Sequence, residues 1–81
     1  PLQALTLLNN RFVLHHAQHM ARRADADAAT VAERVRIAVG WTWQREPSAA
    51  EVDQLTTLAN QHGMESVCRL LLNSNEFLFV D

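Results

Sequence analysis

Two helix-start signatures constrain this chain more than any other feature. Thr30 is followed three residues later by Glu33, and Ser48, which comes after Pro47, is followed at the same spacing by Glu51. In a capping box the Ser or Thr side chain accepts a hydrogen bond from the backbone N–H three residues on, and the Glu side chain reaches back to the cap. The sequence therefore predicts helices that begin just after Thr30 and just after Ser48.

Apolar residues recur at helical spacing through most of the chain. Positions i, i+3, i+4 and i+7 lie on one face of an α-helix. Such stripes are formed by Val13, Ala17, Met20, Ala21 and Ala24; by Val31, Val35, Ala38, Val39 and Thr42; by Val52, Leu55, Leu58, Ala59 and His62; and by Met64, Val67, Leu70 and Leu71. Residues 2–8 add a short apolar helix, and no stretch alternates as a strand would. We predict an all-α fold, a compact bundle of about four to five short helices.

Polar and glycine residues mark where these helices are expected to end. Gly63 fits the position after a helix, where a left-handed backbone is common. Residues 22–29 are small and polar, which indicates a loop or a frayed helix end. The pair of Asn around Ser74 indicates that the last helix ends near Asn73, and the apolar residues 77–80 should then dock on the core as a tail.

Ile37, Trp41 and Trp43 are the candidate interface residues. Ile37 and Trp41 lie off the apolar stripe of residues 31–42, so this helix should contact neighbours on two sides and be the central one. Trp41 and Trp43 are two residues apart and cannot face the same way on a helix. One is expected in the core and the other exposed or buried against a neighbouring domain, where Trp is a common anchor.

Composition sets the broad class. The chain has 81 residues, 48% of them hydrophobic and 20% charged, which predicts a single globular domain over residues 1–81. The net charge of −2 argues against a nucleic-acid partner, which requires a basic patch. No apolar run approaches the roughly 18 residues of a membrane span, so no membrane insertion is predicted. The chain opens on Pro1 rather than Met, which indicates a piece of a longer protein.

The histidines suggest the most specific chemistry. His15 and His19 lie four residues apart, a helical spacing that can hold Zn, Ni or Cu. A zinc site needs further ligands, and the metalloprotease pattern is absent because His16 follows His15 where that pattern has Glu. His62 and Cys68 are the remaining soft ligands. A solvated polar face is the simpler interpretation, so we predict no metal and no cofactor. A metal-binding or enzymatic module built on His15 and His19 is the alternative.

Other catalytic patterns are weak. Cys68 lies in an apolar helix without an orienting Asn or Asp pattern, which favours an inert buried thiol over a nucleophile. Asp25 and Asp27 do not begin a calcium loop, because Thr30 stands where that loop has Gly. With two Gly in the chain there is no glycine-rich phosphate loop. The sequence therefore predicts a protein without catalytic activity.

Three segments taken together resemble a known family. Residues 1–13 resemble a "PLQALxLLNxPFV" segment, residues 34–51 resemble "RIxxAYxxALGRxPTxxE", and residues 71–80 resemble "LLNSNEFLYV". In this order they resemble the C-terminal end of the planctomycete-specific PSD domain family, a large domain of unknown function. The chain departs from the pattern at Arg11, where Pro is frequent, at Val39, where an aromatic is common, and at Gln44, where Gly is usual.

The resemblance implies a large exported protein, periplasmic or on the cell surface, often with a cytochrome-c-like haem domain elsewhere. The chain has no Cys-x-x-Cys-His motif, so haem is not attached here. The family supplies no catalytic residues to carry over. We therefore expect a non-catalytic helical structural or interaction module at the C-terminus of a larger protein. Its partner would be the remainder of the parent polypeptide or another protein.

Overall fold

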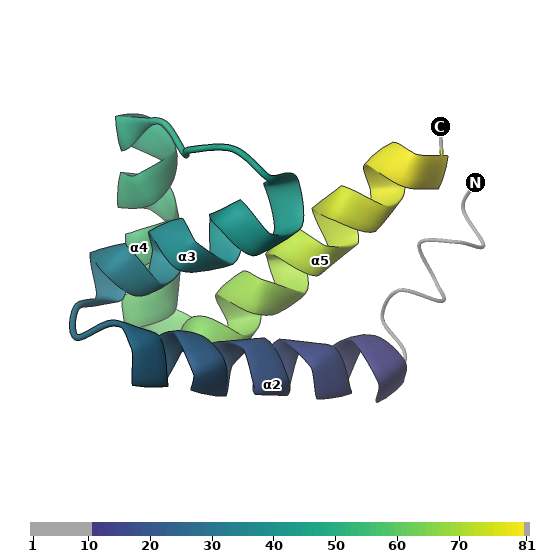
Figure 1. Ribbon diagram of the computed structural model, residues 1–81, viewed down its shortest axis with the longest axis horizontal. Helices are drawn as coiled ribbons and strands as arrows, with labels where there is room; N and C mark the ends of the chain where they lie inside the picture. The colour runs from purple at the N-terminus through teal and green to yellow at the C-terminus, as the bar shows by residue number, and fades with distance from the viewer. Residues whose placement is uncertain (1–10, 81) are drawn as a thin grey trace.

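The computed structural model describes residues 11–80, with side chains for residues 11–74. Its helices are α2 (Arg11–Asp27), α3 (Val31–Trp43), α4 (Ala49–His62) and α5 (Met64–Val80) (Figure 1). Residues 11–80 contain no strand, and the predicted all-α bundle is confirmed. The further helix expected at residues 2–8 lies outside the described residues.

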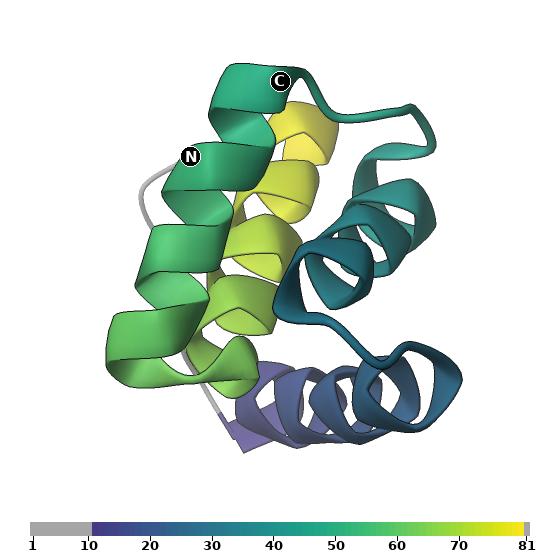
Figure 2. The same ribbon diagram turned by 90° about the vertical axis from the view of Figure 1, so that its left-hand side faces the viewer.

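The helices pack around a centre that α3 and α5 share. Each of these two packs against all three other helices, whereas α2 and α4 pack against α3 and α5. Helices α4 and α5 run in opposite directions on either side of Gly63, and α2 lies across the end at which they join (Figure 2). Helix α3 was expected to be the central one. It shares that position with α5, because each of the two packs against the three other described helices.

The core is made mainly of small and β-branched side chains. Its buried cluster comprises Ala17, Val35, Ala38, Val39, Leu55, Ala59, Val67, Cys68 and Leu71. The predicted stripes of α2, α3 and α4 supply six of these residues, as expected from their periodicity. Helix α2 contributes only Ala17 to the cluster, so its backbone can approach α5 closely.

The two predicted helix starts are confirmed. At α4, Ser48 N donates to Glu51 Oε1 (2.8 Å) and Glu51 N donates to Ser48 Oγ (3.2 Å), which completes the capping box. At α3, Glu33 N donates to Thr30 Oγ1 (3.2 Å), and among the described residues no return bond to the cap is formed. More of the backbone N–H groups at the helix start are therefore hydrogen-bonded by cap side chains in α4 than in α3.

Two predicted helix ends are wrong. Helix α2 continues through residues 22–27, because Ala24 and Ala28 are buried and hold the last turns against the bundle. Helix α5 does not end near Asn73 but runs to Val80, so residues 77–80 belong to its last turns. The packing of the side chains of residues 77–80 lies outside the described side chains.

Two members of the predicted stripes are exposed. Leu70 has 46% of its surface exposed, and His62, the last residue of α4, is also exposed. On α5 the core side is instead formed by Val67, Cys68 and Leu71. The reason is angular, because Leu70 is six residues from Met64 and so lies about 240° around the helix from it.

The end of α3 places a non-glycine residue in a left-handed conformation. Gln44 has φ 57° and ψ 39°, and its N–H donates to Gly40 O (3.1 Å). A side chain in this region costs about 1 kcal/mol, and Gly avoids that cost. The resembled pattern has Gly at this position, so Gln44 carries a backbone strain that Gly would not.

We expect Gln44→Gly to raise the free energy of unfolding by about 1 kcal/mol. Urea unfolding followed by circular dichroism measures the change. Gln54→Gly is the matched control, because Gln54 is exposed inside α4. There the same substitution should lower stability by about 1 kcal/mol. A destabilising Gln44→Gly would show that Gln44 makes a contact worth more than its backbone strain.

Candidate functional site

The connection between α3 and α4 is held by one arginine. Arg45 Nη1 donates to Glu51 Oε1 (2.9 Å) and Arg45 Nη2 donates to Glu51 Oε2 (2.8 Å), a bidentate pair. The Arg45 guanidinium also lies 4.9 Å from the centre of the Trp43 ring. These contacts join the end of α3 to the first turn of α4. Arg45 thus has a structural role at this connection.

Glu51 is held in its charged form by this arrangement. Hydrogen bonds from the Arg45 guanidinium, and then from the Ser48 backbone N–H, lower the pKa of Glu51 from 4.5 to about 2. The folded chain binds fewer protons at Glu51 than the unfolded chain. The ionised Glu51 therefore contributes to the free energy of unfolding, and this contribution is fully present above pH 4.5. It is lost as the pH falls toward about 2.

We expect the wild-type chain to lose stability between about pH 4.5 and 2, and Glu51→Gln to remove part of that loss. Gln can keep the reciprocal capping bond, so the variant isolates the charge. Urea midpoints measured across this pH range test the prediction. Glu33→Gln is the matched control, at the same position of α3 and without an ion pair among the described residues. An identical acid profile for both variants would contradict the assignment.

The predicted interface residues occupy three different environments. Trp43 is half-buried and packs against the core cluster, and its indole N–H is buried without an acceptor in the described part of the chain. Trp41 is 38% exposed, with the Arg23 guanidinium of α2 5.1 Å from its ring centre. Ile37 is half-buried. One Trp is thus in the core and one outside, and the interface role of Trp41, Trp43 and Ile37 stays a prediction.

The histidine pair lies on the exposed side of α2. His15 and His19 are both exposed, and the ring of His16 packs edge-on against Phe12, with centroids 4.4 Å apart. Within residues 11–74 no group of three or more His, Cys, Asp or Glu is placed to hold a metal ion. Because Cys68 is buried in the core, the structure does not bring it to the pair.

Cys68 is unsuited to nucleophilic catalysis. It is fully buried on α5, and burial together with the nearby Glu65 charge raises its pKa to about 11. The thiolate, which is the reactive form, is therefore scarce at neutral pH. This agrees with the interpretation of Cys68 as an inert core residue.

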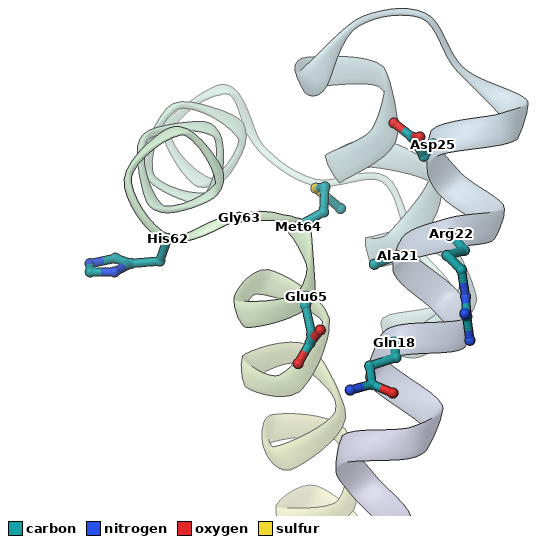
Figure 3. Close-up of a pocket in the computed structure, with 8 residues that line it drawn as sticks. All are labelled: Gln18, Ala21, Arg22, Asp25, His62, Gly63, Met64 and Glu65. Carbon is teal, nitrogen blue, oxygen red and sulfur yellow. The ribbon is translucent and has the colours of Figure 1, made fainter.

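A shallow groove of about 700 Å³ lies between α2 and the junction of α4 with α5. Its walls are Gln18, Ala21, Arg22 and Asp25 of α2 and residues 62–65 (Figure 3). His62 points away from α2 and toward solvent. Asp25 is engaged by Arg34 Nη2 of α3 (3.0 Å). The groove brings together charges of both signs without a convergent catalytic set.

Sequence reasoning missed the two arginines that cover the tryptophans. Arg23 over Trp41 joins α2 to α3, and Arg45 over Trp43 closes the turn after α3. For Arg45 the available signal is its position six residues before Glu51, just ahead of the helix start predicted after Ser48. For Arg23 no local signal exists, because its partner lies on a different helix.

None of the described helices combines the length and hydropathy that a membrane crossing needs.

Comparison with known proteins supplies the family. Searches of curated proteins and of solved structures return no significant match. A family model, PSD1, protein of unknown function (DUF1553), matches residues 1–59. This range includes the motifs at residues 1–13 and 34–51, and the motif at 71–80 lies beyond it. Because the match spans more than two thirds of the 81 residues, the chain belongs to the PSD1 family of proteins of unknown function.

Proposed function

We propose that this chain is a non-catalytic helical module that serves a structural or interaction role within a larger PSD1-family protein. The supporting observation is the exposure of large apolar side chains on a bundle with a closed core. Phe12 is 67% exposed, Leu70 46% and Trp41 38%. Aromatic side chains such as those of Phe12 and Trp41 are enriched at protein–protein interfaces. The partner would be the remainder of the parent polypeptide or another protein.

The polar contacts of the bundle support the same proposal. Thr30, Ser48 and Glu51 cap helices, Arg45 joins two of them, and Arg34 ties α3 to α2. Each of these polar side chains therefore makes a contact that stabilises the fold. As part of the proposal we place the module at the C-terminus of an exported planctomycete-type protein, where the resemblance puts it.

A thermal melt followed by circular dichroism, first with EDTA and then with stoichiometric Zn, tests this proposal. We expect one cooperative helical transition whose midpoint is indifferent to the metal. The alternative, a metal-binding or enzymatic module, predicts a midpoint raised by Zn, because a ligand that binds only the folded state stabilises it. The rise would disappear in His15→Ala and persist in His62→Ala, which removes an exposed His away from α2. That pattern would overturn the structural proposal.

A further inference from the structure

The groove between α2 and the junction of α4 with α5 contains a carboxylate that the fold does not use. Glu65 lies in the first turn of α5 and is half-buried. It forms no ion pair and no side-chain hydrogen bond within residues 11–74. Its side chain points along α5 in the direction of Gln18 rather than back toward Gly63 (Figure 3). The groove therefore holds a negative charge for which the described part of the chain supplies no partner.

The facing wall of the groove supplies a second polar group. Gln18 is exposed on α2, and its side-chain amide projects toward the space between α2 and α5, as Glu65 does from the other side (Figure 3). This amide makes no hydrogen bond within residues 11–74. The same groove is lined by Ala21 and Met64, which are half-buried and pack against the core cluster. The groove thus combines a charged acceptor, a neutral amide and an apolar surface.

The other charged side chains at the groove are directed elsewhere. Asp25 is paired with Arg34 of α3 (3.0 Å). The guanidinium of Arg22 lies on the side of α2 away from α5, and it forms no ion pair with Glu65 or Asp25 (Figure 3). A ligand that enters between α2 and α5 therefore meets the charge of Glu65 first.

This arrangement suits a primary ammonium group on an alkyl chain. The three N–H bonds of an ammonium group diverge, so it can donate to Glu65 and to Gln18 Oε1 on the two walls at the same time. Its alkyl chain can lie against Met64 and Ala21. A planar guanidinium directs its donors as a fork toward one carboxylate, and an anionic ligand would be repelled by Glu65. The groove has about 700 Å³, within the range of about 300–1,000 Å³ that is usual for ligand pockets.

A lysine side chain of a different protein is the source of such a group that fits best. This chain has seven Arg and no Lys, so a second copy of it presents no lysine. A free diamine carries a second ammonium group, for which the groove offers no second unpaired carboxylate, because Asp25 is engaged by Arg34. Arg22 has the same sign of charge as that second group. A lysine brings one ammonium group and leaves the rest of the partner outside the groove.

We propose that this groove binds the side chain of a lysine on a partner protein, with Glu65 and Gln18 as the acceptors of its ammonium group. This inference rests on the proposed interaction role and names the chemistry of one contact with the partner. Glu65 supplies the charge, and Met64 and Ala21 cover the alkyl chain of the lysine.

The probe is Nα-acetyl-L-lysine methylamide, because the side-chain ammonium is its only charge. Binding is followed by NMR spectra of the nitrogen-labelled 81-residue chain, at the side-chain amide of Gln18 and the backbone amides of residues 63–65. We expect saturable shifts at these groups, with a Kd in the millimolar range. Glu65→Gln should weaken binding by about fivefold and Gln18→Leu by about threefold.

Glu33→Gln is the matched control. Glu33 lies in the first turn of α3, as Glu65 does in α5, and it forms no ion pair within residues 11–74. This variant removes the same charge outside the groove and should weaken binding by less than about twofold. The norleucine analogue of the probe, which has the alkyl chain without the charge, should bind at least about fivefold more weakly than the probe.

Four results would overturn the inference. These are equal weakening by Glu65→Gln and Glu33→Gln, equal binding of the norleucine analogue, equal or tighter binding of the arginine analogue, and tighter binding of putrescine. Circular dichroism melts of the same samples, with and without Zn, establish that each variant is folded. A folded, metal-indifferent chain whose groove ignores the lysine probe overturns this inference alone, and a zinc-dependent melt overturns the proposed function.

Discussion

Replacing Leu71 with Ala is expected to lower the free energy of unfolding by about 3 kcal/mol, within the range of about 2–5 kcal/mol for buried Leu. Leu71 has no exposed surface and is among the largest fully buried side chains. It lies on α5, which packs against the three other described helices, so the cavity is bordered by several elements that cannot all close on it. The loss combines the transfer of the missing atoms with the cost of that cavity.

For a chain of this size the effect should be visible without denaturant. Domains have about 0.05–0.15 kcal/mol of stability per residue, so a loss of about 3 kcal/mol is a large share of the total. The melting midpoint should fall by at least about 12 °C. Circular dichroism melts of the variant and the wild type measure this shift.

Leu70→Ala provides the matched control one residue away. Leu70 is 46% exposed, so the same atoms are removed without a closed cavity, and the cost should stay below about 1 kcal/mol. If the two variants were equally unstable, the face that α5 turns to the core would be misassigned. Since the helical pattern alone placed both leucines on one stripe, this pair also tests the structure against the simpler prediction.

The helix starts were predictable because the signal for them is local. Ser48 and Glu51 satisfy each other's backbone groups within one turn, so four residues suffice to identify the beginning of α4. Gly63, with φ 94°, ends α4 as predicted, since few other residues adopt that conformation. These features depend on nothing farther away in the chain.

The helix ends that were missed depend on tertiary packing. Ala24 is the last residue of the predicted apolar stripe, and Ala28 lies one turn beyond it. Both are buried, and this burial holds the last turn of α2 in place through Asp27. Asn73 and Ser74 favour turns in isolation, but both are half-buried and helical in α5. Local propensity was overridden at Asn73 and Ser74, whereas the Ala and Arg of residues 22–27 are good helix formers whose helix is kept by burial.

The candidate site was predictable only in part for the same reason. The exposure of His15 and His19 follows from the periodicity of α2, and one exposed Trp was expected from the spacing of Trp41 and Trp43. The stacking of Arg23 on Trp41 joins residues eighteen positions apart on two helices. No pattern within either helix encodes that contact, because it arises from the angle at which α2 and α3 meet.

The second prediction with a large expected effect concerns the buried side of α2, which carries small side chains. We expect Ala17→Leu to lower the free energy of unfolding by about 2 kcal/mol, within the range of about 1–3 kcal/mol for overpacked cores. Ala17 has no exposed surface and belongs to the cluster that contains Leu71 and Val67 of α5. Three extra carbon atoms at this position must push α2 away from α5 or force side chains from their preferred rotamers.

Ala26→Leu separates packing from helix propensity. Ala26 is exposed on the same helix, and Leu is nearly as good a helix former as Ala, so this variant should stay within about 0.5 kcal/mol of the wild type. Urea unfolding of both variants gives the comparison. A neutral Ala17→Leu would mean that α2 adjusts its position freely on the bundle, and the close approach of α2 to α5 would then not be a requirement of the fold. A selective loss in Ala17→Leu would show that the buried alanines of α2 set the distance at which this helix is held against the bundle.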